Sequence, residues 1–113
     1  SGMAIPHLQA GQGVDVGPYG EALSRQQTHA VFKSADLELL RLVLPRGKSL
    51  PPHRVPGEIT IQCIEGRLEV STPDGRHPLA AGQLLYLERD VEHGVQAIDD
   101  ASALVTIALK PAR

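Results

Sequence analysis

Turn-forming residues recur along most of this chain at a spacing of about ten residues, a rhythm typical of an all-β sandwich or barrel. They lie at residues 34–36, 45–47, 56–57, 65–66, 73–75, 81–82 and 99–100, where Gly, Pro, Asp and Ser gather. Segments rich in Val, Ile, Leu and Thr stand between and around them: residues 28–33, 37–44, 59–64, 67–72, 84–87, 95–98 and 104–109. Because this composition is typical of strands, the sequence predicts an all-β domain.

The clearest hairpin turn lies at residues 73–75, Pro-Asp-Gly, because Asp followed by Gly suits the positive φ that a tight turn requires. It joins residues 68–71 to residues 76–79. The first of these strands alternates apolar and polar residues, which predicts one buried face and one solvated face. Residues 37–44 instead carry leucines in both phases, so we expect both faces of that strand to be covered.

The first 26 residues have a different character from the rest. Gly and Pro are scattered through them, which disfavours regular structure, and only residues 19–25 have the composition of a helical turn. We therefore divide the chain into an N-terminal arm, residues 1–26, and a single domain, residues 27–113. Residues 1–2, Ser-Gly, are typical of the scar of a cleaved expression tag and are set aside.

Charge and composition argue against several partners. The 11 Lys and Arg residues are scattered and the net charge is -2, so nothing predicts nucleic-acid binding. No apolar stretch approaches the roughly 18 residues that cross a bilayer, so we expect no membrane partner. The single cysteine, Cys63, has no partner in the chain for a disulfide, which fits a reducing compartment. We expect a cytoplasmic protein.

A resemblance to a known family emerges at residues 47–66. Gly47 is followed by His53, and Gly66 closes the next turn. This spacing is similar to the first motif of the cupins. Their second motif resembles the segment from Gly82 to His93. The resemblance implies a cupin-type double-stranded β-helix, also called a jelly-roll barrel, over most of the chain.

In a metal-bearing cupin, two His and a Glu of the first motif and the His of the second hold a divalent cation inside the barrel. The resemblance therefore implies His53 and His93 as metal ligands, with Fe, Mn, Ni or Zn as the candidate ions. Val55 stands at the position of the other His and Ile59 at that of the Glu, so the motif is degenerate. Glu58, one residue early, is a further candidate ligand.

His29, in the first predicted strand, is the other candidate to complete the metal shell. A metal-free alternative is an apolar pocket inside the barrel that binds a small organic molecule, with the two histidines as polar anchors. The candidate lining residues are Val55, Ile59, Ile61, Cys63 and Tyr86. Arg41 joins them if its face lines the cavity, where its planar guanidinium would hold a ligand carboxylate.

A third alternative is a mainly structural dimerisation module. Leucines in both phases of residues 37–44, with the apolar residues 104–109, leave apolar faces to cover, and the family commonly pairs. We expect a homodimer with either ligand. The activity stays unassigned at this point, because cupin barrels host many chemistries and the fold does not select among them.

Overall fold

The computed structural model describes residues 7–109, so the predicted tag scar at residues 1–2 lies outside the described residues. The described part of the chain forms one short 3-10 helix, η1 (Gly20–Arg25), and nine strands. The strands are β1 (His29–Lys33), β2 (Leu37–Leu44), β3 (Ser49–His53), β4 (Ile59–Glu65), β5 (Arg67–Thr72), β6 (Gly75–Ala80), β7 (Leu84–Leu87), β8 (His93–Ala97) and β9 (Ala101–Ala108). None of the helical residues described forms a segment long and apolar enough to cross a membrane.

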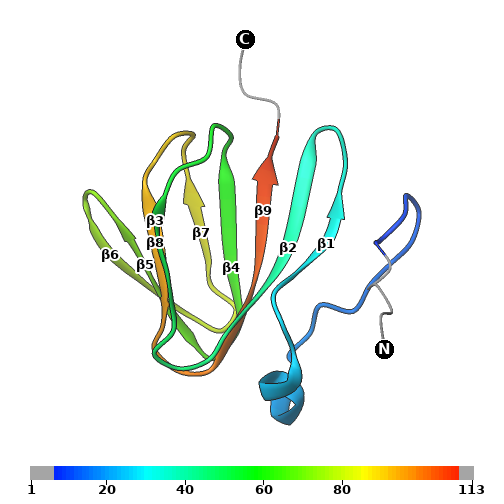
Figure 1. Ribbon diagram of the computed structural model, residues 1–113, viewed down its shortest axis with the longest axis horizontal. Helices are drawn as coiled ribbons and strands as arrows, with labels where there is room; N and C mark the ends of the chain where they lie inside the picture. Colours follow the sequence, from blue (N-terminus) through cyan, green and yellow to red (C-terminus); the bar gives the residue numbers. More distant parts are fainter. Residues whose placement is uncertain (1–6, 110–113) are drawn as a thin grey trace.

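The strands form two antiparallel sheets, which fan out from the lower edge of the view in Figure 1. One has the order β1-β2-β9-β4-β7 and the other the order β3-β8-β5-β6. Strands distant in sequence are neighbours in both sheets, as in a jelly roll, where the chain crosses repeatedly between two layers. The predicted all-β cupin-type barrel is confirmed.

The predicted strands and the helical turn are found with small shifts at their ends, but β3 was not predicted. Its sequence, Ser-Leu-Pro-Pro-His, contains Pro51 and Pro52, which lack the N–H that a strand donates to its neighbour. β3 tolerates them because it lies at the edge of its sheet and pairs only with β8, with an irregular register between Leu50 and His53.

The interior of the barrel is closed at one end and open at the other. On the inward face of β9, Ala101 and Ala103 are completely buried, whereas Val105 and Ile107 are only half-buried. The closed end also contains the turn at Gly66, whose φ is 76° and where an added Cβ would lie 2.0 Å from the carbonyl oxygen of Asp100. Only glycine fits this close approach.

The turn before β8 contains a non-glycine residue with a positive φ. This residue is Asp90, whose φ is 62°, a left-handed conformation that Asp tolerates better than most residues. Its N–H donates a hydrogen bond to the carbonyl oxygen of Val55 at 2.9 Å. This bond joins the loop before β4 to the turn before β8.

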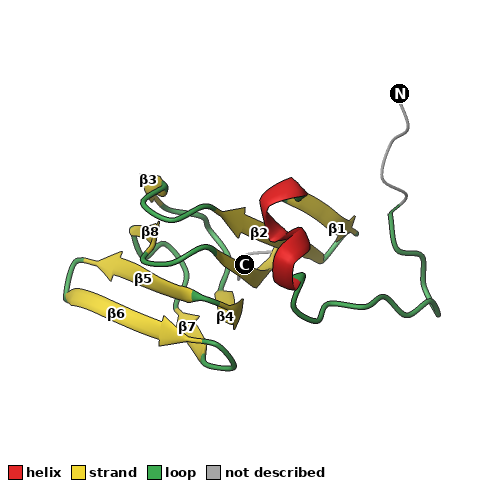
Figure 2. Cartoon of the chain, turned by 90° about the horizontal axis from the view of Figure 1, so that it is seen from below, coloured by secondary structure: helices red, strands yellow, loops and turns green. Residues whose placement is uncertain are grey.

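The described arm residues before Gly20 form neither helix nor strand (Figure 2). The N–H of Leu8 donates to the carbonyl oxygen of Val31 in β1 at 3.0 Å, and the arm enters η1 beside the outer face of the five-stranded sheet. Leu23, in η1, is 6% exposed. The division of the chain at residue 26 stays a prediction.

Candidate functional site

The structure brings His53 and His93 together on paired positions of β3 and β8. Their ring centroids lie 4.7 Å apart, with the ring planes tilted by 49°. His93 shares the inward phase of Val95 and Ala97, both core residues, so its ring faces the barrel interior. His93 is 4% exposed, whereas His53 is exposed, so the pair runs from the interior to solvent.

The histidine pair lies at the open end of the barrel. Ala97, at the far end of β8, pairs with Leu68 next to the closed-end turn, so His93 at the start of β8 lies at the opposite end. Half-buried apolar side chains packed against the core include Val55 and Val91, which flank the pair in sequence.

The ring of His93 is oriented by the backbone. Its Nδ1 lies 3.0 Å from the carbonyl oxygen of Val91, so Nδ1 carries the hydrogen and donates it. With this hydrogen on Nδ1, Nε2 is the ring nitrogen that can accept a hydrogen or bind a metal. Metal-binding histidines usually have their second nitrogen fixed in this way.

Three predicted pocket residues, Ile59, Ile61 and Cys63, point inward from β4 and are at most 3% exposed. They pack within the hydrophobic core. Burial raises the pKa of the Cys63 thiol, the negative charge of Glu65 acts in the same direction, and a hydrogen bond to the Glu65 carbonyl partly opposes them. Cys63 is therefore a protonated core residue.

Glu58 and Tyr86 do not face the interior. The Tyr86 hydroxyl donates a hydrogen bond to the Glu58 carboxylate, and both residues line a hollow on the outer face of the five-stranded sheet. Tyr86 pairs with Thr60, in the phase opposite to the inward Ile59 and Ile61. The predicted position of Tyr86 inside the barrel is therefore wrong, because alternate residues of a strand point to opposite faces. Glu58 also lies on the outer face.

His29 also lies away from the histidine pair. It is paired with Arg41, so both side chains stand on the outer face of the sheet. Its Nδ1 contacts the carbonyl oxygen of Gln27 at 2.9 Å. Within residues 7–109, no group of three or more His, Cys, Asp and Glu side chains is placed to hold a metal ion. The structure thus brings together two of the four ligands that the resemblance implied for a metal-bearing cupin, His53 and His93.

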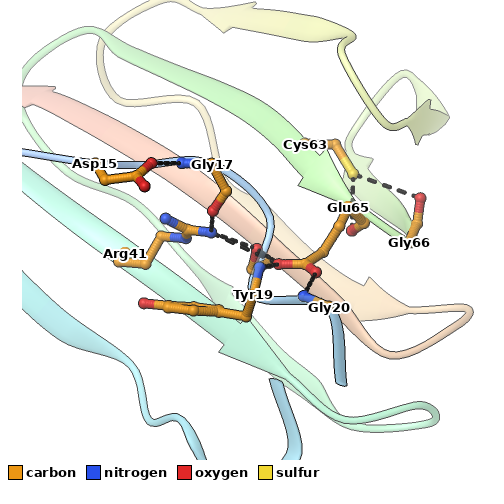
Figure 3. A network of polar contacts seen from close by, with 9 residues as sticks. Asp15, Gly17, Tyr19, Gly20, Arg41, Cys63, Glu65 and Gly66 are labelled. Atoms are coloured by element: carbon orange, nitrogen blue, oxygen red, sulfur yellow. Dashed lines mark hydrogen bonds and ion pairs between the residues drawn. The ribbon is translucent and has the colours of Figure 1, made fainter. Parts of the chain in front are cut away.

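Arg41 is buried on the outer face of the sheet, which corrects its placement inside the barrel (Figure 3). Its Nη2 donates to the Gly17 carbonyl oxygen at 2.8 Å and to Ser102 Oγ at 3.0 Å, and lies 3.6 Å from the Glu65 carboxylate. Its guanidinium carbon stands 4.3 Å from the centroid of the Tyr19 ring, a cation–π contact. The arm, rather than a second sheet, covers this face.

Glu65 is the centre of this network, and the sequence did not indicate it. A β-bulge after Cys63 shifts the register, so that Glu65 pairs with Ser102 on the outer face instead of following the inward phase of β4. Its carboxylate accepts hydrogen bonds from Ser102 Oγ at 2.5 Å and from the N–H groups of Tyr19 and Gly20 at 3.0 Å each. No local sequence pattern marks this bulge.

The pKa of Glu65 lies below its ordinary value. Burial alone raises it, but the hydrogen bonds from Ser102, Tyr19 and Gly20, together with the charge of Arg41, outweigh that effect. Glu65 is therefore ionised at neutral pH and ties the arm to β4 and β9.

The fold resembles many solved structures. A conserved protein of unknown function from Streptococcus pyogenes matches with a TM-score of 0.74 and 17% identity over 99% of this chain and 100% of the other. An RmlC-like cupin protein from Desulfovibrio desulfuricans gives 0.73 and 26% over 89% and 99%. KdgF from Halomonas sp. gives 0.68 and 19% over 74% and 79%. A search of proteins with curated descriptions returns no significant match.

The family model of the cupin domain matches residues 40–109, which is more than half of the chain. The match spans both histidines and strands β3 to β9 in full. It includes residues 40–44 of β2 and does not reach β1, the edge strand of its sheet. The matched residues thus include the turn at Gly66, both histidines and strands of both sheets. The chain belongs to the cupin family.

Proposed function

We propose that this cupin binds a divalent transition-metal ion together with a small molecule at the open end of its barrel, through His53 and His93. The observation that carries the proposal is the spacing of the two rings. Imidazoles bound side by side to one ion, with metal–nitrogen bonds of roughly 2.0–2.1 Å, have ring centroids roughly 4.5–5.2 Å apart. The centroids of His53 and His93 are 4.7 Å apart.

The tautomer of His93 supports the same proposal, because the carbonyl of Val91 holds the proton on Nδ1 and leaves Nε2 as the donor. Two imidazoles leave most coordination positions of the ion open. A bound ion would act there as a Lewis acid toward a ligand oxygen. The donor atoms of the small molecule would complete the shell, while its apolar part contacts Val55 and Val91.

Metal titration tests the proposal directly. Protein purified without nickel resin or chelator is titrated by calorimetry with Mn(II), Fe(II), Ni(II) and Zn(II), and its metal content is measured. We expect one site per chain, and we expect His53→Ala and His93→Ala each to weaken it at least about tenfold, since each removes one of two protein ligands. His29→Ala is the matched control, because that imidazole lies on the outer face.

A variant with an added ligand makes the test sharper. Val55 stands where the family has its other histidine, two residues after His53, and is half-buried, so Val55→His should tighten metal binding at least about tenfold. No site tighter than roughly millimolar in the wild type, with no gain in Val55→His, would contradict the shared metal site.

A metal-free small-molecule site is the second candidate, favoured by the half-buried apolar residues Val55 and Val91, which flank the histidines in sequence and pack against the core. In that case the imidazoles act only as hydrogen-bond partners. The two candidates differ in their response to chelator. A ligand that raises the melting temperature equally with and without EDTA would favour the metal-free site, whereas a rise that needs added metal would favour the joint site.

A further inference from the structure

A second hollow lies outside the barrel, between the N-terminal arm and the outer face of β1 and β2. Its volume is about 270 Å³, and it is separate from the histidine pair. Arg41, His29 and Val31 line it from the sheet, and Asp15 and Tyr19 line it from the arm. Sheet and arm therefore build this hollow together.

Arg41 is the most unusual group in this hollow. It is 2% exposed, and its Nη2 contacts the Gly17 carbonyl, Ser102 and Glu65. Its Nε, by contrast, is buried without any hydrogen-bond partner among the described residues. Figure 3 shows another guanidinium nitrogen turned away from the Glu65 carboxylate. A buried donor of a charged group is rarely left unpaired, so an acceptor other than the described residues is expected beside it.

We propose that the hollow binds a small carboxylate, with Arg41 as the recognition group. A carboxylate is the acceptor that best matches a guanidinium, because both are planar and oppositely charged. The Glu65 carboxylate already accepts hydrogen bonds from Ser102 and from the N–H groups of Tyr19 and Gly20. It pairs with Arg41 only at Nη2. The Nε of the same guanidinium has no acceptor among the described residues, and a bound carboxylate would supply one.

The rest of the lining fixes the kind of carboxylate. Val31 and the ring of Tyr19 offer apolar contact, so an acid with an apolar or aromatic body fits better than a small inorganic anion. His29 has Nδ1 bonded to the Gln27 carbonyl, which leaves its other nitrogen for the ligand. Asp15 also lines the hollow and opposes an anion; its Oδ1 accepts the Gly17 N–H at 2.8 Å.

The side-chain N–H of Arg41 is a direct reporter of binding. The ¹⁵N-labelled protein is titrated with benzoate and, separately, with the neutral isostere benzamide, and the Arg41 Nε–H resonance is followed. We expect benzoate to shift this resonance with saturation and to bind at least about tenfold more tightly than benzamide, because the guanidinium favours a charged acceptor. Equal response to both compounds, or no response to either up to roughly ten millimolar, overturns the proposal.

Two variants keep the test decisive even where the buried arginine is needed for folding. Arg41→Lys retains the positive charge but lacks the Nε donor, and should lose benzoate binding. Asp15→Asn, at an exposed position, keeps an acceptor for Gly17 but removes the opposing charge, so benzoate should bind about twofold or more tightly. Weaker binding in Asp15→Asn would overturn the assignment to a simple carboxylate.

His53→Ala is the control for the location of the site. Its imidazole lies at the open end of the barrel, so the substitution should leave the benzoate response of the Arg41 resonance unchanged. A loss of that response in His53→Ala would place benzoate at the barrel mouth and overturn the second site, whatever the outcome of the metal titration.

Discussion

Replacing Glu65 with Gln should destabilise the fold far more than replacing Glu69 with Gln, although both carboxylates belong to ion pairs of equal length. Glu65 pairs with Arg41 at 3.6 Å, and Glu69 pairs with Arg76 at 3.6 Å. The two pairs differ in burial. The side chains of Arg41 and Glu65 are 3% and 14% exposed, whereas those of Arg76 and Glu69 are 77% and 24% exposed.

The expected magnitudes follow from this difference. Breaking a buried pair leaves the charge of Arg41 uncompensated and costs about 3–5 kcal/mol. Tyr19 and Gly20 donate to different carboxylate oxygens, so the single amide oxygen of Gln keeps only one of these bonds. We therefore expect Glu65→Gln to cost at least the lower end of that range, about 3 kcal/mol. An exposed pair contributes below about 1 kcal/mol, so Glu69→Gln should change little.

Urea unfolding followed by circular dichroism measures both variants. With an m-value of about 2 kcal/mol/M for a domain of this size, the loss in Glu65→Gln lowers the midpoint by about 1.5 M. Amide exchange at Tyr19 and Gly20 should also speed up, because their acceptor is weakened. Equal midpoint shifts in Glu65→Gln and Glu69→Gln would refute the argument that burial decides the strength of these pairs.

The same network predicts a pH dependence. The pKa of Glu65 is lowered in the folded state, so its contribution is fully present above the pKa of the unfolded chain, roughly 4.3. The contribution is lost as the pH falls through the lower folded value. The stability difference between the wild type and Glu65→Gln should therefore shrink below about pH 4. A constant difference from pH 7 to pH 3 would mean that ionisation of Glu65 does not stabilise the fold.

Three further predictions test the closed end, the core thiol and the outer face. Gly66→Ala places a methyl against the Asp100 carbonyl, so it should lower the free energy of unfolding in urea by more than Gly82→Ala does. Gly82 also has a positive φ but has open space around it, so equal losses would point to backbone strain alone. Cys63 should resist a disulfide reagent at pH 8 and react in urea, because burial raises its thiol pKa; fast labelling of the native protein would contradict this. The homodimer stays a prediction: Leu84, 59% exposed on an outer sheet face, is a candidate contact, and Leu84→Lys should shift a dimer toward monomer in light scattering, whereas a monomeric wild type would contradict it.

The strands and turns of the barrel were predictable because their signals are local. Alternating apolar residues mark β5, and Asp-Gly marks the turn before β6. The spacing from Gly47 to His53 and Gly66 indicated the family for the same reason, since it reflects turns that only a few residues can make. β3 was missed because Pro51 and Pro52 oppose a strand locally and are tolerated only at a sheet edge.

The sequence by itself thus determined the all-β class, most of the strands and the two histidines that face each other at the open end. Only the tertiary structure decided which face each polar side chain occupies. The bulge after Cys63 turned Glu65 to the outer face, beside an Arg41 that the arm buries. Tyr86 and Glu58 form a hydrogen bond on the outer face, because the pairing of β7 with β4 sets the face of Tyr86. A one-residue change of register reverses the face of a side chain, and pairing between distant strands sets that register, so no local pattern reveals it.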